Sequence, residues 1–183
     1  LGSGSVVWNQ CAEMGRLTNG AWTGTDTNRQ DYSYNLAGQR TRQTFTAGNY
    51  VDYTYDNIGQ LKTAVGSESG GSPSRLNEQL GYAYDAAGNL NFRTNNSLLQ
   101  TFAVNGVNEL STVWRGGTFT VQGMVGTVDP PVSEVNVSGT GLGAGAADLY
   151  QDHTWARAGA SLADGINSFT ATADDGVSQT NTA

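Results

Sequence analysis

The chain has few of the residues on which most catalytic and metal sites depend. Its 183 residues include one cysteine, one histidine and three prolines. An internal disulfide is excluded because Cys11 has no partner, and the sequence holds no two-cysteine zinc pattern. His153 is the only candidate for a histidine-based catalytic site. We predict that it is an exposed polar residue on a strand or strand edge.

Positive charge is also scarce. Nine Lys and Arg residues stand against 16 Asp and Glu residues, which gives a net charge of −7, and Lys62 is the only lysine. Nucleic-acid binding needs basic clusters, so this balance argues against nucleic acid as a partner. It argues equally against an electrostatic membrane anchor. No run of eighteen apolar residues occurs, so we expect no membrane insertion.

What the sequence does contain is a repeated phrase. Tyr, any residue, Tyr, Asp or Asn, two residues, Gly and a polar residue follow one another three times. The copies are Tyr32–Gln39, Tyr53–Gln60 and Tyr82–Asn89. A period of a few tens of residues is typical of an array in which each unit packs against its neighbours.

Each copy predicts a β-hairpin. Two tyrosines at a spacing of two share one face of a strand, and tyrosine favours strands. Asp or Asn opens the turn by bonding backbone groups two residues on, and the Gly closes a three-residue loop with a bulge. Leu61 and Leu90 would begin return strands. The residues that define the repeat are Tyr32, Tyr34, Gly38, Tyr53, Tyr55, Asp56, Gly59, Tyr82, Tyr84, Asp85 and Gly88.

Two weaker copies flank the clear ones. Met14–Leu17 is similar to the end of a unit, and Phe102–Leu110 fits with Asn108 at the Gly position. Asn tolerates the left-handed conformation that this position needs. Between the second and third clear copies, Gly66–Ser74 is rich in small residues, which predicts a flexible loop.

The Tyr-x-Tyr-Asp-x-x-Gly phrase resembles the YD repeat of RHS proteins, which are large secreted or surface-displayed proteins, mostly bacterial. The resemblance covers about the first 110 residues and implies a curved antiparallel sheet of hairpins over residues 1–113. In full-length members the sheet closes into a shell around a toxic polypeptide. This chain has too few repeats to close a shell, so we expect it to be an excerpt of such an array.

The remainder, residues 114–183, has a different pattern. Short strands are predicted at Thr118–Val121, Val125–Val128, Val135–Gly139 and Ser168–Ala173, with a tight Asp-Gly hairpin at Leu162–Asn167. Such strands, with turns about every ten residues, predict a β-sandwich. The segment resembles bacterial immunoglobulin-like domains. Thr180–Ala183 would begin its last strand, so we expect the domain to be cut short.

The sequence predicts no catalytic, cofactor-binding or metal-binding residue. Calcium is the one cofactor hypothesis, because five carboxylates could gather at one end of the sandwich. Their spacing matches no calcium loop, and turn capping is favoured. They are Asp148, Asp152, Asp164, Asp174 and Asp175. Self-cleaving RHS proteins carry an Asp-Pro-x-Gly-Leu phrase, from which Asp129–Val132 departs, so no protease residue is carried over.

The tyrosines have two interpretations. They could form an aromatic ladder that stacks on sugars, or they could pack against each other between neighbouring hairpins, which we favour.

The resemblance implies a non-catalytic structural and interaction segment of a large secreted or cell-surface RHS protein. The alternative is a carbohydrate-binding module. The expected partners are other segments of the same protein or like chains, through β-edge pairing, and in the alternative glycans.

Overall fold

The computed structural model describes residues 5–9, 17–18, 21–22, 29–126, 131–177 and 180–182. These residues form strands, turns and connecting segments and contain no helix, so the fold is all-β, as predicted. The strands pair antiparallel throughout. None of the described residues lies in a helix that could cross a membrane. Of the expected partial repeat at Met14–Leu17, residues 14–16 lie outside the described residues, and Leu17 belongs to a short strand.

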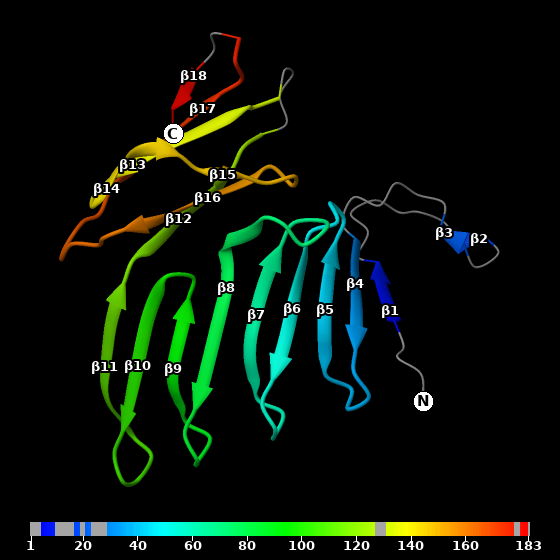
Figure 1. Cartoon of the computed structure of the whole chain (residues 1–183), viewed down its shortest axis with the longest axis vertical. Helices are drawn as coiled ribbons and strands as arrows, with labels where there is room; N and C mark the ends of the chain where they lie inside the picture. The colour runs from blue at the N-terminus through cyan, green and yellow to red at the C-terminus, as the bar shows by residue number, and fades with distance from the viewer. Residues whose placement is uncertain are drawn as a thin grey trace.

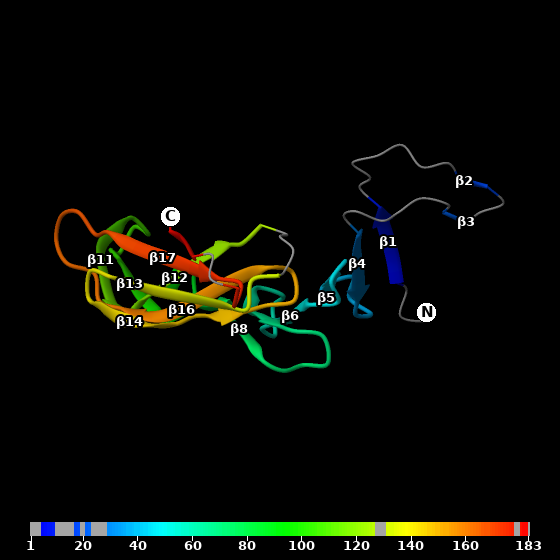
Figure 2. The same cartoon turned by 90° about the horizontal axis from the view of Figure 1, so that it is seen from above.

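The first part of the chain forms one nine-stranded sheet. Its strands follow chain order from β4 to β11, with β1 beside β4 at one edge (Figures 1 and 2). A separate small ladder joins β2 (Leu17–Thr18) and β3 (Ala21–Trp22). The strands of the large sheet are β1 (Ser5–Asn9), β4 (Arg29–Tyr34), β5 (Arg40–Phe45), β6 (Tyr50–Tyr55), β7 (Leu61–Ser67), β8 (Ser74–Tyr84), β9 (Leu90–Asn95), β10 (Leu98–Val104) and β11 (Leu110–Gly117).

The tyrosine-bearing strands alternate as the repeat predicts. Ser33, Thr54 and Ala83 are exposed, whereas the tyrosines on either side of each are half-buried. Because successive side chains of a strand point to opposite faces, the paired tyrosines share one face of the sheet. The return strands begin at Leu61 and Leu90, as predicted.

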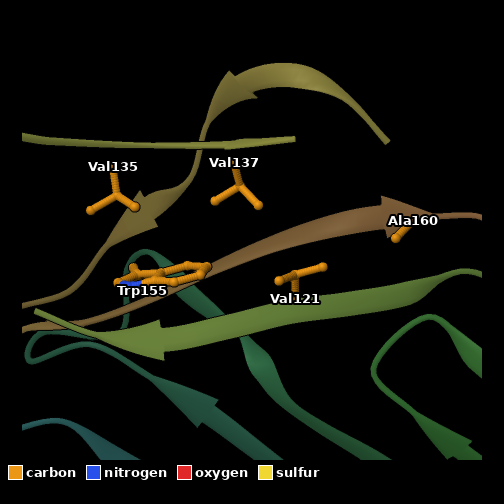
Figure 3. Close-up of a cluster of buried hydrophobic side chains, with 5 residues drawn as sticks. All are labelled: Val121, Val135, Val137, Trp155 and Ala160. Atoms are coloured by element: carbon orange, nitrogen blue, oxygen red, sulfur yellow. The ribbon is translucent and has the colours of Figure 1, made fainter. Parts of the chain in front are cut away.

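The second part of the chain contains two small sheets. One has the order β12-β16-β15 and the other β14-β13-β17-β18. Buried residues of both meet in one core, where Val121 and Trp155 face Val135 and Val137 (Figure 3). The strands are β12 (Phe119–Met124), β13 (Glu134–Gly139), β14 (Leu142–Ala146), β15 (Asp148–Leu149), β16 (Thr154–Ala160), β17 (Phe169–Asp174) and β18 (Thr180–Thr182).

The position at which the sheet changes differs from the expected boundary at residues 113 and 114. Strand β11 continues through Gly117 in the large sheet, and β12 begins at Phe119. Gly117 has a φ of 81°, and the N–H of Thr118 donates to Ser97 O at 3.2 Å. The chain therefore leaves the large sheet only after Gly117, past the point where the tyrosine pattern stops.

One predicted element of the second part is absent, and another lies partly outside the described residues. Leu162–Asn167 is not a tight hairpin, because it connects β16 and β17, which belong to different sheets. Asn167 holds this connection by bonding the backbone of Ala163 and Gly165. No strand begins at Val125, whose N–H donates to His153 O, and residues 127–130 lie outside the described ranges.

The segment Gly66–Ser74 is not simply a flexible loop. Gly66 and Ser67 belong to β7, Ser74 opens β8, and only residues 68–73 connect the two strands. The Glu68 side chain is 4% exposed and pairs with the Arg75 guanidinium, so the connection packs inward. It lies at the end of the sheet that meets the second part of the chain, where β8 contacts β12 and β16.

Candidate functional site

The turns of the repeat are built identically. In each turn, the carbonyl of the Asp or Asn that opens it accepts a hydrogen bond from the N–H three residues later, and its own N–H donates to the carbonyl four residues later. At Asp56 these bonds are Gly59 N to Asp56 O, 3.1 Å, and Asp56 N to Gln60 O, 2.9 Å. The carboxylate of Asp56 also accepts from the N–H groups of Ile58 and Gln60. Asn35, Asp85 and Asn105 repeat these side-chain bonds.

The predicted left-handed conformation is confirmed at every one of these turns. The φ values are 76° at Gly38, 91° at Gly59, 84° at Gly88 and 62° at Asn108. Such values favour glycine, and asparagine is the side chain that tolerates them best. The hairpin part of the repeat is therefore explained by local turn chemistry.

The polar residue that ends each phrase reaches the next turn. A Cβ at Gly59 would lie 3.2 Å from Gln39 Nε2, and one at Gly88 would lie 3.4 Å from Gln60 Nε2. Asn89 Nδ2 donates to Asn108 Oδ1 at 3.1 Å, which continues the pattern. The last residue of the phrase thus lies against the next hairpin turn along one rim of the sheet, the lower one in Figure 1, and at Asn89 this contact is a hydrogen bond.

We expected equivalent tyrosines of neighbouring hairpins to pack directly against each other. The structure shows that they do not. Strand β5 lies between the strands of Tyr32 and Tyr53. The gap is filled by Arg40, which lies 4.3 Å from the Tyr32 ring centroid and 5.8 Å from that of Tyr53. Tyr53 Oη donates to Gln43 Oε1 at 3.0 Å. The reason is topological, because each hairpin places its return strand between two tyrosine-bearing strands.

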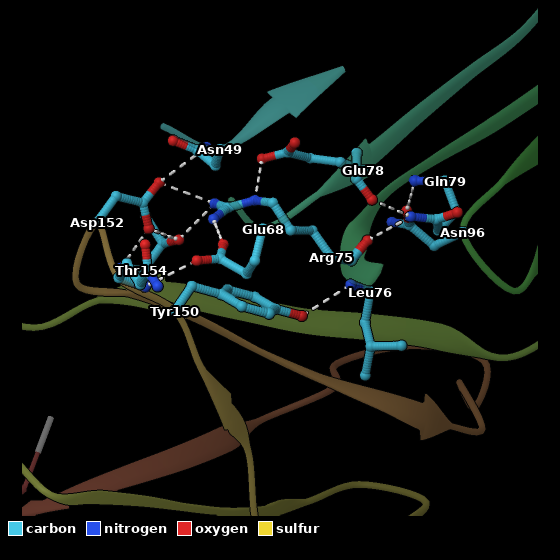
Figure 4. Close-up of polar contacts among 12 residues, drawn as sticks. Asn49, Glu68, Arg75, Leu76, Glu78, Gln79, Asn96, Tyr150, Asp152 and Thr154 are labelled. Carbon is cyan, nitrogen blue, oxygen red and sulfur yellow. Dashed lines mark hydrogen bonds and ion pairs between the residues drawn. The ribbon is translucent and has the colours of Figure 1, made fainter. Parts of the chain in front are cut away.

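A buried ionic cluster connects the two parts of the chain (Figure 4). Arg75, on β8, is 1% exposed and forms ion pairs with Glu68, Glu78 and Asp152, the last on the turn before β16. Its guanidinium also lies 4.5 Å from the ring centroid of Tyr150. Three carboxyl groups therefore share one guanidinium.

Further hydrogen bonds strengthen this junction. Leu76 N donates to Tyr150 Oη at 2.7 Å, and Arg75 donates to Thr154 Oγ1 at 2.7 Å. Gln151 N donates to Glu68 Oε2 at 3.2 Å. Because a charge that loses its buried partner is costly, the cluster fixes where the second part of the chain sits on the sheet.

The carboxyl groups of the cluster respond differently to their surroundings. Burial raises the pKa of Glu78, and the nearby Arg75 only partly offsets this. Burial also pushes the pKa of Asp152 upward, but hydrogen bonds from Thr154 and Arg75 outweigh it and hold that pKa below its usual value. Burial raises the pKa of the Tyr150 phenol, against the hydrogen bond from Leu76 N.

A cavity of about 300 Å³ adjoins the cluster and is lined by Asn49, Asn77, Glu78 and Asp152 among others. Asn49 Oδ1, Asn77 Oδ1 and Glu78 Oε2 are buried there without a hydrogen-bond partner. Buried acceptors of this kind are commonly satisfied by water. Arg75 already supplies a cation at this place, and no cluster of metal-ligating side chains occurs among the described residues.

The other candidate residues have local roles. His153 is exposed, as predicted, but it occupies the left-handed position of a turn, with a φ of 64°, instead of a strand. Turn capping is confirmed for three of the carboxylates: Asp152 accepts from Thr154 N, Asp174 from Gly176 N and Asp175 from Val177 N.

Sequence reasoning missed the buried cluster. Its members lie far apart in the chain, and the small residues around Glu68 suggested only a loop. The available signal was a charged pair, Glu68 and Arg75, that flanks this apparently solvated stretch. The turn at Gly48, with a φ of 89°, was missed as well, since no tyrosine pair precedes it.

Comparison of the sequence with protein-family models gave no match, and comparison with curated proteins gave none either.

Proposed function

We propose that this chain is a non-catalytic structural segment of a large secreted or cell-surface protein of the RHS type. In this proposal the nine-stranded sheet is part of a YD-repeat array, and the two-sheet unit is an immunoglobulin-like domain attached to it. The array would be extended by other segments of the same protein or by like chains. The observation that carries the proposal is the contact between successive hairpin turns, which recurs from one hairpin to the next along the sheet.

The outer strand β11 supports this extension. It is the last strand of the sheet, and its exposed apolar residues include Leu110, Val113 and Trp114, with exposed fractions of 60%, 48% and 56%. An edge strand offers unpaired backbone groups, and apolar side chains on it favour pairing with another strand. The partner in this proposal is therefore a strand of the same repeat type.

Sedimentation velocity over a wide concentration range tests the proposal. The chain should self-associate, and Trp114→Lys should shift it towards monomer, because charge on an edge strand opposes pairing. Ile166→Lys is the matched control, since Ile166 is 92% exposed but lies in a connection. A strictly monomeric chain, or equal effects of the two variants, would contradict edge pairing.

A second candidate function is carbohydrate binding, and one observation favours it. Tyr32, Tyr53 and Tyr82 are only half-buried and share one face of a sheet that the views show as a single layer (Figures 1 and 2). Aromatic side chains with one wet face suit amphipathic ligands such as sugars. A glycan-array screen of the intact chain tests this candidate, and failure to retain any glycan would count against it.

A further inference from the structure

The cavity beside the buried ionic cluster has more hydrogen-bond acceptors than donors to fill them. It has a volume of about 300 Å³ and is lined by the turn between β5 and β6, by β8 and by the turn before β16. Asn49 Oδ1, Asn77 Oδ1 and Glu78 Oε2 are buried here, and none of them bonds to another group of the described residues. An acceptor that is buried without a donor destabilises the fold. The cavity is therefore suited to a ligand that brings donors.

Asn49 is the best defined of these groups. The residue is 3% exposed, and its backbone is held by a turn in which Phe45 N donates to Asn49 O at 2.9 Å. Asn49 Nδ2 donates to Asp152 Oδ2 at 3.5 Å (Figure 4). Turning the amide over would place Oδ1 against that carboxylate, so the hydrogen-bond network fixes the orientation of the amide. Asn49 Oδ1 is consequently left as a buried acceptor without a donor.

Only one oxygen of Glu78 is satisfied. Oε1 accepts from Arg75 Nε at 2.8 Å, whereas Oε2 has no partner among the described residues. Arg75 is shared with Glu68 and Asp152, and burial raises the pKa of Glu78 more than Arg75 lowers it. A second cation beside Oε2 would stabilise the ionised form of this carboxyl group.

The number and kind of these atoms favour one class of donor. A water molecule donates two hydrogen bonds but brings two lone pairs that need donors of their own. Calcium takes roughly six to eight oxygen ligands, and the described lining offers three unpartnered oxygens beside the cation that Arg75 already supplies. A primary ammonium group brings three N–H donors and no acceptor. It therefore matches the three acceptors in both number and charge.

The rest of the lining suits the alkyl stem of such a group. Phe45 and Ala47 supply apolar surface beside the polar atoms. A long aliphatic amine lies with its methylene groups along apolar surface while its charged end stays among polar groups. The volume exceeds that of an ammonium group alone, so part of the stem can enter with it.

We propose that this cavity binds a primary alkylammonium group, supplied either by a free amine or by a lysine side chain of a partner. Asn49 Oδ1, Asn77 Oδ1 and Glu78 Oε2 accept its three hydrogen bonds. Its stem lies against Phe45 and Ala47. The site is independent of both the repeat array and the glycan candidate, so failure of either leaves it untouched.

Nuclear magnetic resonance of the intact isotope-labelled chain at neutral pH tests the proposal, because the side-chain amide signals of Asn49 and Asn77 report on the site directly. Titration with n-butylamine, which is protonated at this pH, should shift both signals until they saturate. 1-Butanol has the same stem without the charge, and N,N,N-trimethylbutylammonium keeps the charge without N–H donors. Each should bind at least about tenfold more weakly, because it lacks the charge-assisted hydrogen bonds.

Two variants and a control locate the binding. Glu78→Gln removes the charge of one acceptor while keeping the shape of the side chain, and it should weaken n-butylamine binding about tenfold. Asn77→Ala removes another acceptor without changing the charge, so it provides an independent loss if Glu78→Gln does not fold. Glu109→Gln is the matched control, since Glu109 is exposed in the turn between β10 and β11 at the other rim of the sheet. It should bind as the wild type does.

Nα-acetyl-lysine methylamide distinguishes the two sources of the ammonium group. Once n-butylamine binds, equal or tighter binding of the lysine derivative assigns the site to a lysine side chain, and weaker binding assigns it to free amines.

The proposal is overturned if neither amine shifts the amide signals of Asn49 and Asn77, or if the trimethyl analogue binds as tightly as n-butylamine. Equal losses in Glu78→Gln and Glu109→Gln would show that the amine responds only to the net charge of the chain. Saturable shifts with calcium chloride that n-butylamine does not displace would indicate a metal site instead.

Discussion

Replacing Arg75 tests the importance of the buried ionic cluster. Arg75→Ala removes the only cation that contacts Glu68, Glu78 and Asp152 among the described residues. The Glu68 side chain is 4% exposed, so water cannot replace the lost partner efficiently. Removing one member of a buried pair usually costs about 3–5 kcal/mol, and we expect a loss in this range.

A surface pair provides the matched control. The side chains of Arg42 and Asp52 are 43% and 45% exposed, and exposed pairs contribute about 0–1 kcal/mol. Urea unfolding of Arg75→Ala, Arg42→Ala and the wild-type chain, followed by far-UV circular dichroism, measures both losses. If Arg75→Ala costs no more than Arg42→Ala, the cluster does not hold the two parts of the chain together.

The pH dependence of this variant supplies a second measurement. Arg75 lowers the pKa values of Glu78 and Asp152, so its removal raises both in the folded state. A group whose pKa is raised in the folded state stabilises the fold while it is protonated. This contribution is present at low pH and is lost as pH rises through the folded-state pKa. The deficit of Arg75→Ala should therefore shrink between pH 7 and pH 4. A constant deficit would contradict this explanation.

Three further predictions concern the turns and the phenols. Gly59→Val should lower the free energy of unfolding by about 1–3 kcal/mol, because φ is 91° there. Ala83→Val, at an exposed strand position, should lower it little. Equal melting temperatures of the two variants would refute the role of the turn. Ala64 is buried in β7, so it is unsuitable as a control position. Asp56→Ala should cost about 1 kcal/mol by freeing two N–H groups, and Asp164→Ala should be neutral by the same thermal assay. Burial raises the pKa of Tyr150, so the stability that this phenol contributes is present below about pH 10 and is lost above it. In urea titrations, Tyr150→Phe should therefore reduce the loss of unfolding free energy at alkaline pH. An unchanged loss would exclude this phenol as its cause.

Local turn chemistry explains why the hairpins were predictable. Asp56 and Gly59 act within five residues of each other, so the sequence alone contains the whole interaction. The same holds for Asn108, whose side-chain type indicates its left-handed backbone. The all-β class followed from these turns and from strand alternation.

The junction was not predictable because its partners are brought together only by tertiary structure. Glu68 and Asp152 are 84 positions apart, and nothing in either local sequence indicates the other. The hairpin predicted at Leu162–Asn167 was wrong for a related reason. An Asp-Gly pair indicates a turn but not which sheets the flanking strands join. The predicted packing between tyrosines was wrong because a return strand lies between the tyrosine-bearing strands of successive hairpins.

The contacts between successive turns have a consequence for how such a sheet can diversify. On one rim, Gln39 and Gln60 lie against the glycine of the next turn, and Asn89 donates to Asn108. Between β5 and β10, the connections on the opposite rim differ in length, from two residues at Asn96–Ser97 to six at residues 68–73. Two of them also lie against each other, since a Cβ at Gly48 would lie 3.2 Å from Ser69 Oγ. The longest of these supplies Glu68 to the docking cluster. One rim therefore repeats a single turn design, while the opposite rim varies in length and carries the attachment of the second part of the chain.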